Sequence, residues 1–144
     1  MDAVDELIEQ LKHWDWDMRE IAAYKLGFLK DKKSIQALIE ASGDQYVGVR
    51  IGSGLALTYI INSSSLQELP DIEIQLKDAG IKERQSSNTN KEILGTVLRK
   101  LIVLNKRRNE LLVEEVVSIK IEGKKFPQSA APGPQPIYRI KRVA

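Results

Sequence analysis

The strongest constraint on the fold of this chain is a pattern that occurs twice in its first half. Residues 5–33 and 36–64 align so that apolar, basic and small positions coincide at a single offset. The matching pairs are Leu7 with Leu38, Met18 with Val49, Arg19 with Arg50, Ala23 with Gly54, and Leu26 with Leu57. A fixed repeat period of this kind is typical of chains that stack one supersecondary unit on the next. The pattern therefore predicts two copies of one unit.

Each unit has the spacing of two amphipathic helices, because its apolar residues recur every three or four positions. In the first unit these are Ala3, Val4, Leu7, Ile8 and Leu11, then Met18, Ile21, Ala22, Leu26 and Leu29. In the second they are Ile35, Leu38 and Ile39, then Val47, Val49, Ile51, Leu55 and Ile60. Asp2 and Asp44 are suitable N-caps. The small residues Ala22, Ala23, Gly52 and Gly54 indicate close helix packing. We expect four helices in two antiparallel hairpins over residues 5–62.

Two segments, DWDMREIAAYKLGFLKD and DQYVGVRIGSGLAL, resemble the short HEAT-like repeats of the phycobilisome-lyase type. The core of those repeats reads roughly D-x-D-x-x-V-R-x-x-A-A-x-A-L-G, and the resemblance covers about residues 3–62. Asp15 and Arg19 match it in the first unit, and Asp44 and Arg50 in the second, with Tyr46 in place of the inner acid. The resemblance implies an α-α superhelix in which these acids and arginines hold the turn and the neighbouring repeat together.

The repeat period does not continue, since Arg50 would map to Ile81 and Leu57 to Asn88. Local signals still predict a helix from about Leu69, with Pro70 in its first turn and Gly80 as its cap. A polar loop over 82–90 follows, and then a helix over about 90–115 that starts at the capping box Thr89–Glu92. Because this helix has a broad apolar face, we expect it to be the most buried. Residues 1–115 would form one repeat domain whose last hairpin is a diverged cap.

From Val116 the period changes to two. Val117, Ile119 and Ile121 alternate with Ser118, Lys120 and Glu122, which predicts a strand ending at Gly123. Four prolines follow within 126–136, and 137–143 alternates again. The segment 116–144 would therefore carry a small C-terminal β element. A two-stranded ribbon is marginal alone, so it would pack on the helices, pair with a second copy as a homodimer, or stay flexible.

The composition, 42% apolar and 29% charged, is that of a globular protein. The absence of cysteine excludes disulfides and thiolate zinc sites and suits a reducing compartment. The first residues, MDAVDELIEQ, do not resemble a secretory signal, and LIVL at 101–104 is too short to span a bilayer. We therefore expect a cytoplasmic protein without a membrane partner.

The sequence offers no constellation for catalysis. His13 is the only histidine, and it lacks the partners that a general base or a metal site needs. Gly52-Ser53-Gly54 looks like a phosphate-binding loop but falls within a predicted helix. We predict no catalytic residue, cofactor or metal, and no enzyme activity.

Charge is distributed unevenly although the total is only +2. Residues 1–65 carry 7 basic and 10 acidic side chains, whereas 117–144 carry 6 basic and 1 acidic. Cations interleaved with aromatic residues suit single-stranded nucleic acid. The candidates for that role are Lys120, Lys124, Lys125, Tyr138, Arg139, Lys141 and Arg142, with Lys106–Arg108 as a further basic patch. The alternative is a solvated basic tail.

The function that we predict is a non-enzymatic scaffold or adaptor that binds another protein. Trp14 and Trp16 share one turn, where they either anchor a partner or pack on the neighbouring hairpin. Tyr24 and Lys25 lie on the second helix of the first unit, which in HEAT-like arrays faces the partner. The first alternative is a nucleic-acid-associated protein that uses the basic C-terminus. The second, implied by the resemblance, is a role like that of the bilin lyases.

Overall fold

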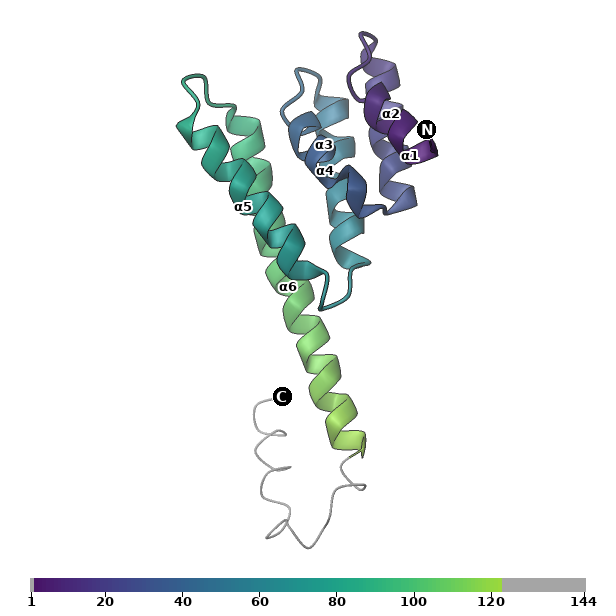
Figure 1. The fold of residues 1–144 in the computed structure, drawn as a ribbon, viewed down its shortest axis with the longest axis vertical. Coiled ribbons are helices and arrows are strands. Elements are labelled where there is room, and N and C mark those ends of the chain that lie inside the picture. The colour runs from purple at the N-terminus through teal and green to yellow at the C-terminus, as the bar shows by residue number, and fades with distance from the viewer. Residues whose placement is uncertain (1, 123–144) are drawn as a thin grey trace, which may run out of the picture. The chain divides into compact units, whose positions relative to one another are not determined.

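The computed structural model describes residues 2–122 of the chain, and this part is mainly helical (Figure 1). No strand occurs between residues 2 and 122. The elements, in order, are α1 (Ala3–Gln10), α2 (Trp16–Leu29), the short 3-10 helix η1 (Lys32–Ser34), α3 (Ile35–Ala41), α4 (Val47–Asn62), α5 (Leu69–Gln85) and α6 (Lys91–Glu122). They divide into a compact unit that ends at Arg108 and the stretch from Asn109 onward.

The first four helices confirm the two predicted hairpins. Trp16 and Val47, the first residues of α2 and α4, are separated by one repeat period, as the alignment requires. Asp2 caps α1 by accepting a hydrogen bond from the backbone N of Asp5 at 2.8 Å. The matched residues Leu26 and Leu57 are both fully buried, so equivalent positions form the core of both hairpins.

Glycine allows α2 and α4 to pack closely. A Cβ atom on Gly27 would lie 3.0 Å from the Cα of Ala56, and one on Gly52 would lie 3.3 Å from the Cβ of Ala23. The prediction that Gly54 serves the same purpose is wrong. A Cβ atom there would have Lys100 as its nearest neighbour, at an ordinary 3.8 Å.

The third hairpin consists of α5 and the first part of α6, which lie side by side (Figure 1). Arg108 Nη2 donates to Glu73 Oε1 at 2.9 Å and ties the two helices together. The predicted helix end at Gly80 is wrong, because α5 continues to Gln85 and the loop begins only at Ser86. Two physical reasons explain the longer helix. A Cβ on Gly80 would lie 3.3 Å from Val97, which indicates that α6 packs here, and the following IKERQ consists mostly of good helix formers.

The predicted strand over 116–122 is also wrong, because α6 runs without interruption to Glu122. Val117, Ile119 and Ile121 are therefore exposed side chains of a helix. The preference of β-branched residues for strands is weak compared with the cooperative extension of an existing helix. The second predicted strand, 137–143, lies outside the described residues.

The expectation that this long helix would be the most buried is wrong as well. Val97 and Leu104 are the buried apolar residues of α6, whereas Val49, Ala56, Leu57, Ile60 and Ile61 of α4 are all buried. The central helix of a stack is covered on both sides by its neighbours, which explains the difference. None of the helices within residues 2–122 has the length and apolarity needed to cross a bilayer.

Candidate protein-binding surface

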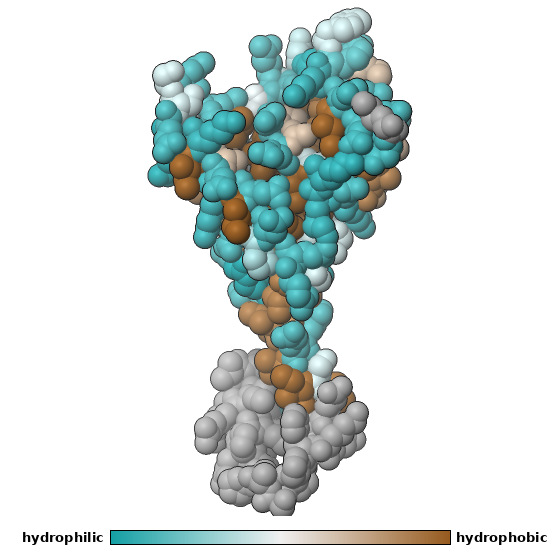
Figure 2. Space-filling model, in the orientation of Figure 1, coloured by the Kyte–Doolittle hydropathy of each residue, from teal (hydrophilic) through white to brown (hydrophobic). Residues whose placement is uncertain are grey.

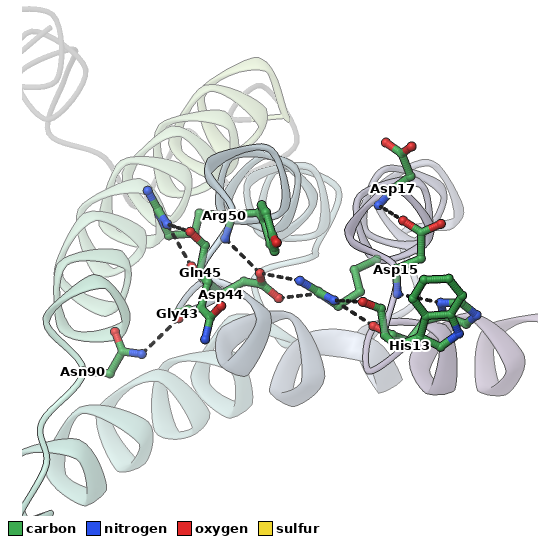
Figure 3. Close-up of polar contacts among 11 residues, drawn as sticks. His13, Asp15, Asp17, Gly43, Asp44, Gln45, Arg50 and Asn90 are labelled. Atoms are coloured by element: carbon green, nitrogen blue, oxygen red, sulfur yellow. Dashed lines mark hydrogen bonds and ion pairs between the residues drawn. The ribbon is translucent and has the colours of Figure 1, made fainter.

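An arginine–aspartate pair joins the turns of the first two hairpins (Figure 3). Arg19 Nε lies 2.8 Å from Asp44 Oδ2, and Arg19 Nη2 lies 3.1 Å from Asp44 Oδ1. Both side chains are only 14% exposed. Arg19 Nη1 also donates to the carbonyl oxygens of His13 and Trp14, so its guanidinium binds its own turn as well as the next one. Such a two-point, charge-assisted contact fixes orientation as well as distance.

Arg50 makes the equivalent contacts within its own turn. Its Nη1 donates to the carbonyl oxygens of Asp44 and Gln45 at 2.8 and 3.0 Å, and these acceptors follow His13 and Trp14 by one repeat period. Its nearest carboxylate is that of Glu92, at 3.8 Å and 58% exposed, so the ion pair to the third hairpin is weak. Asn90 Nδ2 completes the connection by donating to the carbonyl oxygen of Gly43 at 3.1 Å (Figure 3).

The acidic residues of the repeat pattern shape the turns. Asp15 caps α2 by accepting from the backbone N of Asp17 at 3.0 Å. Asp44 Oδ1 accepts from the backbone N of Tyr46 at 3.0 Å, and His13 Nδ1 accepts from Asp15 N at the same distance in the preceding hairpin. These polar groups therefore satisfy the turns of the helical body rather than pointing to a ligand.

Aromatic side chains lie exposed at both ends of the α2–α4 pair. Trp16 stacks on Tyr46 with ring centroids 5.6 Å apart, and Phe28 stacks on Tyr59 at 6.5 Å. The guanidinium of Arg19 lies 5.3 Å from the centre of the Tyr46 ring. Thus Trp16 packs on the second hairpin, whereas Trp14 is 86% exposed and stands beside His13. Exposed, partly fixed aromatic rings are the usual anchors of protein interfaces.

The other two partner-binding candidates differ in accessibility. Tyr24 is half-buried, since its ring lies 3.2 Å from the position of a Cβ on Gly52 and so covers α4. Lys25 is exposed. Lys25 is therefore more accessible to a partner than Tyr24 is.

A groove of about 400 Å³ separates α4 from the first part of α6. On the α4 side it is lined by the aliphatic residues Val47, Ile51 and Leu55, which are 40–59% exposed, and by Arg50. Its α6 wall is polar and includes Glu92, Arg99 and Lys100. Gly54, with no side chain, leaves space between the two walls.

The groove carries positive charge that the described residues do not neutralise. Lys100 Nζ donates to Thr58 Oγ1 at 3.0 Å, and Arg99 Nη2 donates to Thr96 Oγ1 at 3.3 Å. Among residues 2–122, neither cation forms an ion pair. Burial lowers the pKa of Lys100 below its ordinary value, and repulsion from Arg99 lowers this pKa further. A carboxylate entering the groove would offset both effects, because an opposite charge beside Lys100 favours its protonated form.

The predicted nucleic-acid residues are mostly beyond the described part of the chain. Lys124, Lys125, Tyr138, Arg139, Lys141 and Arg142 lie there, and Lys120 is exposed on α6. Within the basic triplet, Lys106 is exposed. Arg107 Nε donates to the carbonyl oxygen of Ser64, and Arg108 binds Glu73, so these two cations serve packing.

Sequence reasoning missed Phe28, Tyr59, Arg99 and Lys100. Phe28 and Tyr59 are themselves one repeat period apart, so the repeat alignment contained the signal for the stacked pair. No comparable signal existed for Arg99 and Lys100, because the third hairpin is out of register. The first residues of α4 and α6, Val47 and Lys91, are farther apart in the sequence than Trp16 and Val47, which begin α2 and α4.

Within residues 2–122 no three histidine, cysteine or carboxylate residues gather closely enough to hold a metal ion. Comparison with known protein families and with curated proteins gives no match to this chain.

Proposed function

We propose that the protein is a short HEAT-like α-α superhelix that acts as a non-enzymatic scaffold or adaptor for another protein. Support for the repeat comes from the turns, where Arg19 and Arg50, one repeat period apart, bind equivalent carbonyl oxygens. Units that contact only their neighbours leave one continuous surface for a partner. A cytoplasmic location is part of this proposal and rests on the cysteine-free composition.

The observation that carries the proposal is the exposure of aromatic rings along the first two hairpins. Trp14 is 86% exposed and Phe28 72% exposed, while stacking holds Phe28 in place against Tyr59. Large rings with restricted motion bury much area on binding and lose little entropy. These residues are therefore the proposed contact points, with Trp16 and Lys25 beside them.

Affinity purification with matched variants tests this proposal. The full chain, expressed in the cell that makes it, is chemically crosslinked, and the crosslinked sites are mapped by mass spectrometry. We expect partner crosslinks near α2 and α4, and at least about tenfold weaker capture with Trp14→Ala or Phe28→Ala, the loss typical of an interface anchor. Ile81→Ala, an exposed apolar position on α5, is the control and should leave capture unchanged. Equal recovery with all three variants would contradict the proposal.

The alternative is a nucleic-acid-associated protein that uses the basic C-terminal segment. It is supported by the charge of 117–144, with 6 cations against 1 acid. It receives no support from Arg107 and Arg108, which are engaged within the helical body. A gel shift at two salt concentrations separates it from the scaffold function.

A further inference from the structure

The last turns of α6 carry an acidic and aliphatic surface. Within residues 109–122, Leu112, Val116 and Ile119 are 41–55% exposed. Together with Glu115 they occupy positions i, i+3, i+4 and i+7, which share one side of a helix. In Figure 2, brown apolar atoms gather along this stretch. Burial of such an aliphatic surface against another surface would stabilise this part of the helix.

The groove between α4 and α6 has the complementary properties. Its aliphatic wall, Val47, Ile51 and Leu55, recurs every four residues and extends for about 12 Å along α4. The row from Leu112 to Ile119 extends for about 10 Å. Opposite the aliphatic wall stand Arg99 and Lys100, two cations that no carboxylate among residues 2–122 neutralises. The row of residues from Leu112 to Ile119 therefore matches the groove in length, in aliphatic character and, through Glu115, in charge.

We propose that the acidic side of residues 109–122 in one copy of the chain docks in the α4–α6 groove of a second copy. Leu112, Val116 and Ile119 pack against the aliphatic wall, and Glu115 pairs with Lys100 and Arg99. This is the recognition of an amphipathic helix by an apolar groove. It is independent of the proposed binding of another protein, which uses Trp14, Phe28 and the residues beside them.

Two features favour a second copy over other occupants. Residues 91–122 form one uninterrupted helix, so the segment would enter the groove of its own copy only if that helix broke. A nucleic acid fits the groove poorly, because the α4 wall offers aliphatic side chains instead of the aromatic rings on which bases stack. Burial lowers the pKa of Lys100, and the Glu115 carboxylate of the second copy would offset this electrostatic cost.

Light scattering and sedimentation of the full chain test the inference directly. The mass of the chain is 16.2 kDa. If each copy docks its helix in the groove of the other, the measured mass should rise toward twice that value as concentration increases. Higher salt should weaken association because the contact includes ion pairs. A mass that stays at one chain up to millimolar concentration would overturn the inference while leaving the scaffold proposal intact.

Matched charge reversals locate the contact. Glu115→Lys should raise the dissociation constant at least about tenfold, since one lost ion pair beside an apolar contact is worth that much. Glu114→Lys makes the same charge change on another side of the helix and should have little effect. Lys100→Glu should weaken association in the same way as Glu115→Lys, with Lys106→Glu as its control. Mixing the Lys100→Glu and Glu115→Lys chains should restore association as a mixed dimer.

Because Lys100 is half-buried, Lys100→Glu could weaken association by disturbing the fold, and a variant without a charge change is needed as well. Gly54→Leu fills the groove without altering charge, and leucine favours the helix more than glycine does. Circular dichroism should show intact helix while association is lost. Association that persists in both Gly54→Leu and Glu115→Lys would rule out this groove.

Discussion

Leu26 and Leu57 occupy the same position in successive hairpins, and both are fully buried between helices. Neighbouring positions on the same helices differ sharply, since Leu29 is 50% exposed and Phe28 72% exposed. At the scale of single residues, stability therefore depends on the face of the helix rather than on hydrophobicity alone.

Replacing Leu26 by alanine tests the assignment of the buried face. We expect Leu26→Ala to lower the free energy of unfolding by about 2–5 kcal/mol, because a cavity remains in a packed core. Leu29→Ala removes the same atoms from a half-exposed site and should cost less than about 1 kcal/mol. Urea unfolding followed by circular dichroism measures both. Equal losses for the two variants would show that the face is misassigned.

Replacing Gly27 of α2 and Gly54 of α4 by alanine should change the free energy of unfolding in opposite directions. Gly54→Ala should raise the free energy of unfolding by about 0.5–1 kcal/mol, because alanine is the better helix former and the space is open. Gly27→Ala should lower it, since the new Cβ would lie 3.0 Å from the backbone of Ala56. Thermal unfolding of both variants provides the measurement. Stabilisation by Gly27→Ala would contradict the close packing of α2 on α4.

At the scale of elements, polar contacts join the hairpins to one another, and their strength decreases along the chain. Arg19 and Asp44 form a two-point contact at 2.8 and 3.1 Å, whereas Arg50 and Glu92 approach only to 3.8 Å. The interval between the starts of α4 and α6 is longer than that between the starts of α2 and α4, so the third hairpin does not place a carboxylate where Asp44 lies in the second. The third hairpin is joined to the second instead by the Asn90 amide, which donates to the carbonyl oxygen of Gly43, and by Arg107, which donates to that of Ser64.

The ion pair within the third hairpin makes stability depend on pH. The hydrogen bond from Arg108 holds the pKa of Glu73 below its ordinary value of 4.5. A lowered carboxylate pKa stabilises the fold above the unfolded-state pKa, and this contribution is lost as pH falls through the folded-state value. Glu73→Gln should therefore cost about 0.5–1 kcal/mol at pH 7 and almost nothing near pH 2.

Urea unfolding of wild type and Glu73→Gln at pH 7, 4 and 2 gives this difference. Asp78→Asn, which removes an exposed acid from the middle of the same helix, is the control and should show a smaller dependence on pH. A Glu73→Gln effect that does not change between pH 7 and pH 2 would exclude the ion pair as its cause.

At the scale of the whole molecule, three surfaces of different character lie on different segments. Exposed aromatic rings lie on the first two hairpins. An aliphatic groove that contains Arg99 and Lys100 lies between α4 and α6, and an acidic helix surface follows Asn109. The basic residues of the sequence beyond Lys120 lie outside the described part. The proposed partner binding, self-association and nucleic-acid binding would thus use separate residues, and mutations can test them separately.

The nucleic-acid alternative predicts a steep dependence on salt. Five effective phosphate contacts would give a log–log slope of about −4.5, hence a loss of roughly 10²–10³ in affinity between 50 and 200 mM salt. Alanine at Arg139, Lys141 and Arg142 should flatten the slope by up to about 3 units while helicity stays constant. Gel shifts and circular dichroism measure these quantities. An absence of binding to DNA and RNA at 50 mM salt would exclude this function.

The sequence by itself determined the parts that depend on local periodicity and turn chemistry. The four helices of residues 3–62, the cap at Asp2, the buried pair Leu26 and Leu57 and the mainly helical class all follow from it. These features repeat at one spacing, so each unit supports the interpretation of the other. The aromatic pair Phe28 and Tyr59 was accessible to the same alignment.

Only the tertiary structure decided the features that depend on what lies beside a segment. The alternating residues of 116–122 suit a strand, yet the continuing helix α6 determines their conformation. Gly80 suits a helix end, but packing against Val97 keeps it within α5. The groove residues Gly54, Arg99 and Lys100 come from helices that are far apart in the sequence. No local sequence pattern predicts that these residues form a groove. The repeat period does not continue to α6, and only helix packing brings the two walls together.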